Sequence, residues 1–317
     1  MGQLLYLHHP SPEAPDPQGH TMGDLLAYHI AEVLPTKAPT TQYQQTRFLA
    51  KLTRDFGQLP LSAITPAWLR QWRDQLALHR LKPDTIRQYM DSLSAVLSTA
   101  VYDLEWLDTN PMHGRKVRKP PLSRGRVRFL SPEEQERLLR ACWDSQNSSL
   151  YPLVLLALTT GARRGELFSL RWQDVDLDRG FLRLEHTKNT DRRAVPVPQV
   201  TLEVLWTCRE GRQETDWLFP RQGEKAAFPY EHAWQAALLR AGLTGTFRFH
   251  DLRHTAASYL AMSGASLIEI ADILGHKTLA MVRRYSHFTD GHTKGVVERM
   301  ALQFVKSQRQ PEGAPHG

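Results

Sequence analysis

The chain has 317 residues, of which 41% are hydrophobic, and a formal net charge of +7 with an isoelectric point near 9.5. This length predicts two domains with apolar cores of their own, and the positive charge favours an anionic partner. The two cysteines, Cys142 and Cys208, stand far apart and outside any CxxC pattern. This argues against a zinc site or a disulfide framework and fits a reducing compartment.

The N-terminal residues predict neither secretion nor membrane insertion. Residues 1–20 lack a basic segment followed by a long apolar one, which is the pattern of a signal peptide. No apolar run in the sequence approaches the length of a membrane span. We therefore expect a flexible tail over 1–20 and a cytoplasmic protein with no membrane partner.

Residues 21–112 predict a small bundle of helices. Apolar residues recur at helical spacing over 21–34, 40–56, 66–79 and 83–104. Pro66 and Pro83 stand at the first positions of the last two segments, where proline is favoured because no intrahelical N–H bond is lost.

Residues 113–130 predict a basic linker. The stretch 111–130 holds seven Lys and Arg and no Asp or Glu, whereas the residues on either side of it nearly balance their charges. Pro120, Pro121 and Gly125 interrupt regular structure there. The positive excess of the chain is therefore concentrated in this segment.

Residues 131–290 predict a second domain, mostly helical with a small sheet. Ser131, Pro132 and Glu134 form the start signal of a helix, a capping box with proline at the first position. A buried helix is expected to end at Gly161, and two strand-like runs around the polar turn KNTD predict a β-hairpin. Further helical patterns cover 199–209, 231–241, 250–263, 266–274 and 278–284, and an amphipathic segment covers 292–306 within a C-terminal tail, 291–317.

Polar residues gather at the expected ends of these elements. In TGARRGEL, 160–167, Arg163 has the planar fork that suits a phosphate, and Glu166 either orients this arginine or pairs with it at the surface. Lys188 in the hairpin turn either reaches into a groove or is simply solvated. Neither segment by itself shows whether its basic residue has a function or only faces solvent in a turn.

The segments HDLRH and LGHKTLAMVRRYSHF carry the other polar groups. His250 shares a helical face with Arg253 and His254, so His250, Asp251 and His254 suggest a metal site. A hydrolytic metal needs further converging ligands, and the nearby sequence offers none. His276 follows a predicted helix end, and Tyr285 comes nine residues later.

The joint order of these motifs resembles the tyrosine recombinase family, also called phage integrases. The resemblance rests on the arginine of TGARRGEL, a hairpin lysine, HDLRH, LGH and a tyrosine nine residues after that histidine. It covers about 160–290 through motifs and 21–120 more loosely. It implies a mainly α fold with a small antiparallel β-sheet, made of an N-terminal helical-bundle core-binding domain, which binds DNA, and a C-terminal mixed α/β catalytic domain.

The resemblance also implies roles for six residues: Arg163, Lys188, His250, Arg253, His276 and Tyr285. The arginines would bind the non-bridging oxygens of a DNA phosphate and stabilise the charge that develops on them. Tyr285 would attack the phosphorus and form a 3′-phosphotyrosine, with His250 as the favoured base and Lys188 as the acid. His276 would bind the phosphate or position the tyrosine, and His287 has a lesser claim to assist. Because the covalent intermediate preserves the phosphodiester, neither ATP nor a metal nor another cofactor is expected.

The implied partners are double-stranded recombination sites in DNA, further copies of the chain in a homotetramer, and DNA-bending or directionality factors. The location would be the nucleoid. The C-terminal segment would dock on a neighbouring protomer or on its own domain. Seven linker residues are expected to contact DNA phosphates: Arg115, Lys116, Arg118, Lys119, Arg124, Arg126 and Arg128.

Several functions stay open. About 20 residues precede the first helix, too few for an additional arm-site domain. This would suit a simpler integrase or a chromosome-dimer-resolving recombinase of the Xer type, and we favour the integrase of a prophage or mobile element. Outside the family, the candidates are a metal-dependent nuclease using His250, Asp251 and His254, and a DNA-binding protein that has lost catalysis.

Overall fold

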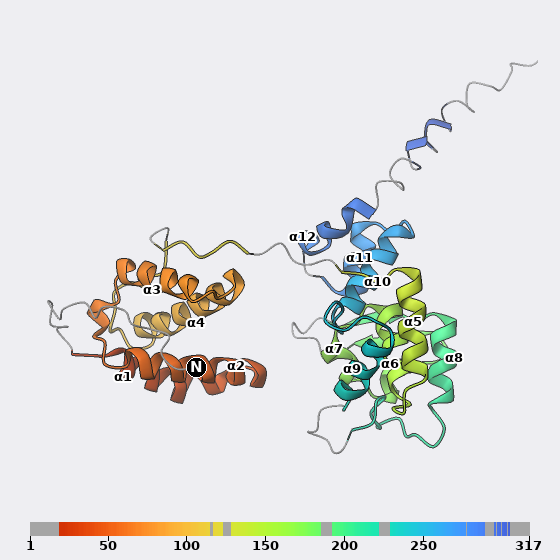
Figure 1. The fold of residues 1–317 in the computed structure, drawn as a ribbon, viewed down its shortest axis with the longest axis horizontal. Helices are drawn as coiled ribbons and strands as arrows, with labels where there is room; N and C mark the ends of the chain where they lie inside the picture. The colour runs from red at the N-terminus through yellow and green to blue at the C-terminus, as the bar shows by residue number, and fades with distance from the viewer. Residues whose placement is uncertain are drawn as a thin grey trace, which may run out of the picture. The chain divides into compact units, whose positions relative to one another are not determined.

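The computed structural model describes residues 19–114, 117–122, 128–184, 192–221, 229–276 and 278–288, together with 295, 297, 298, 300–302 and 304. The chain forms two compact units, Met1–Gly125 and Arg126–Gly317 (Figure 1). The fold is mainly helical with one small antiparallel sheet, which confirms the predicted fold class. The predicted residue bounds of the domains and the linker stay predictions. No helix among the described residues is both long and apolar enough to cross a bilayer.

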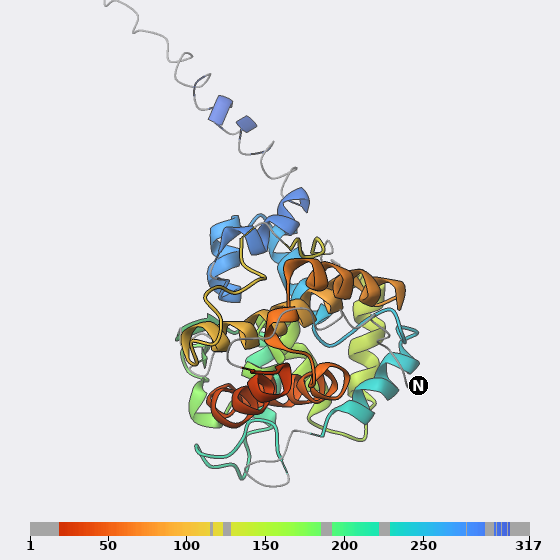
Figure 2. The ribbon, with the colours of Figure 1, turned by 90° about the vertical axis from the view of Figure 1, so that its left-hand side faces the viewer.

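The first unit is a helical bundle, drawn in red to orange in Figure 1 and after a quarter turn in Figure 2. A π-helical segment (His29–Val33) and a 3₁₀ turn (Leu34–Thr36) continue its first helix. Leu26, Trp72 and Leu93 belong to a core to which all four helices contribute. The predicted helices are confirmed as α1 (Met22–Tyr28), α2 (Pro39–Phe56), α3 (Pro66–Leu78) and α4 (Pro83–Tyr102).

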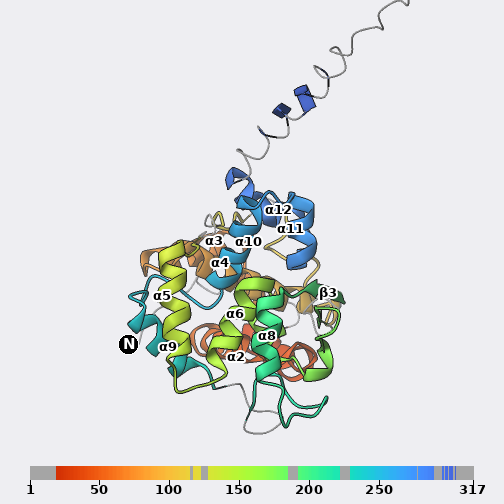
Figure 3. The same ribbon diagram turned by 90° about the vertical axis from the view of Figure 1, so that its right-hand side faces the viewer.

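Helix α6 (Leu150–Thr160) is the centre of the second unit. It packs against α5 (Pro132–Trp143), α8 (Gln199–Thr207) and α10 (Asp251–Met262), and Figure 3 shows it between α5 and α8. Nearly all of its side chains are buried, as expected of a helix that is apolar on every side. It ends at Gly161 in the left-handed conformation, and α5 begins with the predicted capping box.

The sheet has the strand order β1 (Val175–Asp176), β2 (Phe181–Leu184), β3 (Arg193–Pro196), with both pairs antiparallel. Leu182 faces Val195 and Leu184 faces Arg193 across β2 and β3, which confirms the predicted hairpin. Lys188 and the predicted turn around it lie outside the described residues. The sequence did not predict β1, because two residues are too few to show an alternation.

The remaining helices include one that the sequence did not predict. The short α7 begins at Arg164, where the sequence suggested only a turn. The segment predicted as helical over 278–284 divides into the four-residue α12 and a 3₁₀ helix, η5, which carries Tyr285. The bounds are α7 (Arg164–Phe168), α9 (Glu231–Arg240), α11 (Leu267–Leu274), α12 (Leu279–Val282) and η5 (Arg283–Phe288).

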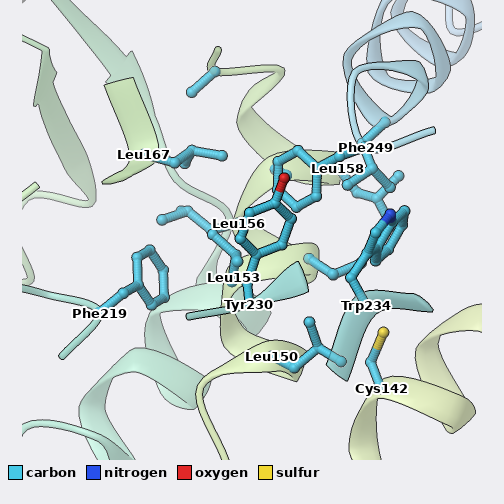
Figure 4. Packing of buried hydrophobic residues seen from close by; sticks show 14 of the residues in the cluster. Cys142, Leu150, Leu153, Leu156, Leu158, Leu167, Phe219, Tyr230, Trp234 and Phe249 are labelled. Carbon is cyan, nitrogen blue, oxygen red and sulfur yellow. The ribbon is translucent and has the colours of Figure 1, made fainter. Parts of the chain in front are cut away.

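An aromatic cluster fixes the chain just before α10. The ring centroid of Phe249 lies 5.2 Å from that of Tyr230 and 5.4 Å from that of Trp234, both in edge-to-face arrangements. Figure 4 shows these rings beside Leu158 of α6. Such aromatic pairs add specific geometry to their large buried area. Because Phe249 directly precedes His250, the core of the unit sets the position of that histidine.

Gly161 provides a test of the packing between the end of α6 and Leu274 of α11. Its φ is 60°, and a Cβ there would lie 2.3 Å from Cδ2 of Leu274. We expect Gly161→Ala to lower the free energy of unfolding by about 1–3 kcal/mol, because backbone strain and overpacking both act. Gly242→Ala is the matched control, since its φ is 69° but no described atom lies within 4 Å of the added Cβ. Equal urea midpoints for the two variants would contradict the close approach at Gly161.

Candidate active site

Two arginines are held by carbonyl groups at the ends of helices. Arg253 in α10 donates from Nη1 to the carbonyl of Gly161 and from Nη2 to that of Leu274, each at 2.7 Å. Arg163 donates from Nη2 to the carbonyl of Gly275, also at 2.7 Å. Carbonyl groups at helix C-termini lack intrahelical partners and carry the negative end of the helix dipole. The ends of α6 and α11 therefore orient both guanidinium groups.

Glu166 links Arg163 to a third arginine. Its carboxylate is only 4% exposed and accepts hydrogen bonds from the backbone N–H and Nη1 of Arg163, both at 2.8 Å. It also accepts from Nη1 and Nη2 of Arg193 on β3, at 3.1 and 2.8 Å. Because Glu166 is buried, it orients Arg163 from the interior and does not pair with it at the surface.

The resulting cluster has more positive than negative charge. Arg163, Arg193 and Arg253 face one carboxylate, that of Glu166. Burial and the charge of Arg163 lower the pKa of Arg253 to about 9, so this guanidinium keeps its charge at neutral pH. Charges removed from water need oppositely charged partners. An anion that enters beside this cluster would offset its surplus of positive charge.

The C-terminal cap of α11 sets the position of His276. The backbone N–H of His276 bonds to the carbonyl of Ala271 at 2.8 Å, and that of Gly275 bonds to the carbonyl of Asp272 at 3.1 Å. These two bonds form a Schellman motif with Gly275 in the left-handed conformation. A Cβ at this glycine would lie 2.5 Å from Nη1 of Arg193, so the guanidinium group would have to shift if residue 275 had a side chain.

His276 is neutral and has a buried polar atom without a partner. Burial and the charges of Arg253 and Arg163 lower the pKa of His276 to about 3. Its Nδ1 atom has no hydrogen-bond partner among the described residues. Buried polar atoms are normally satisfied, and exceptions occur at functional sites. A substrate oxygen or hydroxyl group would provide the missing hydrogen bond.

Tyr285 is buried against α10 and is only 1% exposed. Its ring packs in a small cluster with Ala257, Ala261 and Val282. Its hydroxyl oxygen lies 2.5 Å from Nδ1 of His254. Burial raises the pKa of Tyr285, although the charges of Arg284 and Arg253 act in the opposite direction.

His250 lies at the start of α10, at the edge of a groove of about 650 Å³. Two exposed arginines, Arg164 and Arg248, also line this groove. Partial desolvation of the ring and the charge of Arg253 lower the pKa of His250. His250 and His254 meet edge-on, with their ring centroids 5.2 Å apart.

The proposed metal ligands do not form a cluster. The carboxylate of Asp251 accepts a hydrogen bond from the backbone N–H of Arg248, at 2.9 Å. In the described part of the chain, no three His, Cys, Asp or Glu side chains are grouped so as to hold a metal ion.

The charge of Arg253 or of Arg163 acts on each of the predicted catalytic residues that the structure describes. These residues belong to the second unit and are five of the six: Arg163, His250, Arg253, His276 and Tyr285. Lys188 lies outside the described residues, and all six roles stay predictions. Sequence reasoning missed Arg193, which nothing in the sequence distinguishes from Arg192. It treated His254 only as a metal ligand, although its spacing from His250 placed both on one face.

The described basic residues of the linker interact within their own units. Nζ of Lys119 lies 2.6 Å from Oδ1 of Asp91. The two terminal nitrogens of Arg128 donate to the carboxylate of Glu134, at 2.9 and 2.6 Å, and the carbonyl of Arg118 accepts a hydrogen bond at 2.9 Å from a neighbouring helix. The other predicted DNA contacts lie outside the described residues: Arg115, Lys116, Arg124 and Arg126.

Two family descriptions match the chain. The Phage integrase family matches residues 128–292, and the Phage integrase SAM-like domain matches residues 21–118. The Shufflon-specific DNA recombinase of Escherichia coli is 33% identical over 205 residues, which are 64% of this chain and 51% of that protein. The integrase of Salmonella phage P22 is 30% identical over 217 residues, 64% of this chain and 54% of that protein. The chain thus spans about half the length of these two relatives.

A solved structure shares the fold. The Tn1549 transposon integrase in complex with transposon right end DNA superimposes with a TM-score of 0.73 at 20% identity. The match covers 89% of this chain and 100% of that one. The similarity therefore extends over both units of the chain.

Glu166 makes the stability of the second unit depend on pH. Burial raises the pKa of this carboxyl, but hydrogen bonds from Arg193 and Arg163 outweigh burial and leave the pKa below its usual value. The stabilisation is therefore complete above the unfolded pKa, about 4.3, and is lost as the pH falls through the lower folded value. We expect Glu166→Gln to cost about 3–5 kcal/mol at pH 7, because it leaves buried cations uncompensated.

Urea unfolding at pH values from about 7 down to about 3 measures this effect. The wild type should lose stability in the acid range more steeply than Glu166→Gln, which has no carboxyl to titrate. Glu136→Gln on the exposed side of α5 is the matched control and should behave as the wild type. A wild type and a Glu166→Gln variant with the same pH dependence would contradict the assignment.

Proposed function

The chain belongs to the phage integrase family, and we propose that it is a site-specific tyrosine recombinase that cleaves and rejoins DNA strands through Tyr285. The observation that carries this proposal is the cluster of arginines oriented by helix-end carbonyls beside a buried tyrosine. Its surplus of positive charge suits a phosphodiester, and phosphoryl transfer depends above all on positioned charge.

The arginines would hold the scissile phosphate. A guanidinium group has five N–H donors, and two of those of Arg253 bond to the carbonyls of Gly161 and Leu274. These bonds fix the plane of the group, so its other N–H bonds have defined directions. Non-bridging oxygens would accept them, and the interaction would strengthen as negative charge grows in the transition state.

The chemical step would transfer the phosphoryl group from DNA to the protein. The hydroxyl oxygen of Tyr285 attacks phosphorus, the bond from phosphorus to the 5′ oxygen breaks, and a 3′-phosphotyrosine and a 5′-hydroxyl result. His276 and His250 are neutral at pH 7 and would hydrogen-bond to the phosphate. Lys188 is the proposed acid for the leaving oxygen. The covalent bond preserves the energy of the phosphodiester, so the reaction needs neither ATP nor a metal.

Tyr285 must become accessible for this attack. Only 1% of its surface is exposed. The residue lies on η5, a 3₁₀ helix that packs against α10 and α11. We propose that η5 shifts when DNA occupies the arginine cluster, and that the hydroxyl then reaches the phosphorus.

The comparisons favour mobile DNA as the substrate. The relatives include a shufflon-specific recombinase and a phage integrase, and the related transposon integrase was solved with transposon end DNA. We therefore propose double-stranded recombination sites as the target, a homotetramer on DNA, accessory factors that bend DNA or set direction, and a place on the nucleoid. Integration or excision of a mobile element is the favoured role, and Xer-type resolution is the alternative.

Covalent capture tests the nucleophile. On a nicked suicide substrate that contains the recombination site, in EDTA, the wild type should form a covalent protein–DNA complex that survives denaturation. Tyr285→Phe should form none, because it lacks the attacking oxygen. Tyr259→Phe is the matched control, since its hydroxyl bonds to the carbonyl of Leu130. Covalent product from Tyr285→Phe would reject this nucleophile, and tight binding by a wild type that forms none would support a catalytically inactive protein.

The salt dependence of DNA binding tests the linker. Each phosphate contact contributes about −0.9 to the slope of log K against log salt concentration. Replacing Arg115, Lys116, Arg124 and Arg126 with alanine should therefore flatten this slope by up to about 3.6. The control variant Lys119→Ala/Arg128→Ala removes two charges that already face carboxylates, so its change per charge should be smaller. An unchanged slope in the fourfold variant would show that the linker does not contact phosphates.

A further inference from the structure

The hydroxyl of the tyrosine contacts the last residue of the HDLRH motif, His254, to which the resemblance assigned no role. The hydroxyl oxygen of Tyr285 lies 2.5 Å from Nδ1 of His254, although the two residues are 31 positions apart. His254 lies on α10, one turn from Ala257 and two turns from Ala261, and both alanines pack in the cluster that holds the Tyr285 ring. One face of α10 therefore places both the ring and the hydroxyl.

The direction of this hydrogen bond depends on the charge states of the two groups and on the tautomer of the imidazole. Burial and the charge of His250 lower the pKa of His254 to about 4, with Arg284 and Arg253 acting in the same direction and Asp251 in the opposite one. Burial raises the pKa of Tyr285. At neutral pH the imidazole is thus neutral and the phenol protonated. In the tautomer that carries its proton on Nε2, Nδ1 of His254 accepts a hydrogen bond from the tyrosine O–H, and the proposal rests on this tautomer.

We propose that His254 positions the Tyr285 hydroxyl and accepts its proton as the tyrosine attacks the phosphodiester, an inference that rests on the proposed recombinase function. The resemblance gave this step to His250. That residue lies one helical turn away at the edge of the groove, whereas His254 contacts the reacting oxygen itself. A proton acceptor must be within hydrogen-bond reach of the proton that it removes.

The step is balanced. The proton passes from the Tyr285 oxygen to Nδ1 of His254, the oxygen–phosphorus bond forms, and the bond to the 5′ oxygen breaks. The 5′ oxygen takes its proton from a separate acid, for which Lys188 is proposed. When the strand is rejoined, a 5′-hydroxyl displaces the tyrosine, and His254 returns the proton to the phenol oxygen.

Binding of the substrate would adjust the basicity of His254. In the structure, His254 lies near the cationic groups of Arg253 and Arg284, which disfavour a charged imidazole. A phosphate beside these arginines adds negative charge and favours the imidazolium. The histidine would therefore become a better proton acceptor when DNA occupies the site and would remain a neutral partner of the tyrosine when it does not.

Single-turnover cleavage of the nicked suicide substrate tests the proposal. We expect His254→Ala and His254→Gln to slow covalent-complex formation by about 10²–10⁴-fold, the usual range for loss of a proton acceptor. The glutamine keeps a hydrogen-bond acceptor but takes up no proton, so it separates proton transfer from positioning. His232→Gln on α9 is the matched histidine control and should cleave as the wild type. DNA binding and thermal unfolding of each variant are measured alongside.

A more acidic nucleophile provides the decisive readout. The phenol of ordinary tyrosine has a pKa of about 10, and that of trifluorotyrosine is lower. Trifluorotyrosine at position 285 therefore depends less on a proton acceptor. We expect it to restore cleavage at least about tenfold in the His254 variants and to change the rate little when His254 is present. If the His254 variants were slow only because their packing was damaged, a more acidic phenol would not restore cleavage.

The outcomes separate this proposal from the assignment of the nucleophile. Cleavage by both His254 variants at nearly the wild-type rate, with Tyr285→Phe inactive, would overturn the role of His254 and leave the recombinase function standing. Slow His254 variants that trifluorotyrosine fails to rescue would reduce His254 to a packing residue. Covalent product from Tyr285→Phe would instead remove the nucleophile on which both proposals depend.

Discussion

A buried guanidinium group needs oxygen atoms to face it, and this requirement organises the second unit. Arg253 is 4% exposed, and its oxygen partners are the carbonyls of Gly161 and Leu274. Arg163 meets the carbonyl of Gly275 and the carboxylate of Glu166. Carbonyls at helix ends are suited to this task because they have no partner within their own helix. The positive site is therefore built from helix termini and one carboxylate, and its geometry depends on where α6 and α11 end.

The ends of these helices in turn depend on glycine. Gly161 and Gly275 both adopt left-handed conformations, and a Cβ at either position would meet a neighbouring side chain at 2.3 or 2.5 Å. Each glycine thus ends a helix, admits a close neighbour and presents a carbonyl to an arginine. The aromatic cluster around Phe249 holds the start of α10 from the other side. The packing of the core therefore fixes the positions of the arginines, because a shift of α6, α10 or α11 would move the guanidinium groups.

The same burial that concentrates positive charge keeps the histidines neutral. Burial, with a neighbouring histidine for His254 and neighbouring arginines for His276, lowers the pKa of His254 to about 4 and that of His276 to about 3. A neutral imidazole can accept a hydrogen bond from a hydroxyl or donate one to a phosphate, and it does not add to the charge of the cluster. The tyrosine, buried and protonated, occupies the apolar side of this arrangement. An anion bound beside the arginines would change the electrostatic balance of these groups.

The sequence by itself determined the local features and their order. The capping box at Ser131, the helix that stops at Gly161 and the paired strands of the hairpin follow from patterns within a few residues, and the structure has all three. The ordered motifs identified the family. Only the tertiary structure decided which groups meet: Glu166 binds Arg193, which is 27 residues away, and Tyr285 meets His254 across 31. Periodicity and capping report the conformation of neighbouring residues, whereas contacts between distant residues are set by how whole helices pack, and no short pattern encodes that packing.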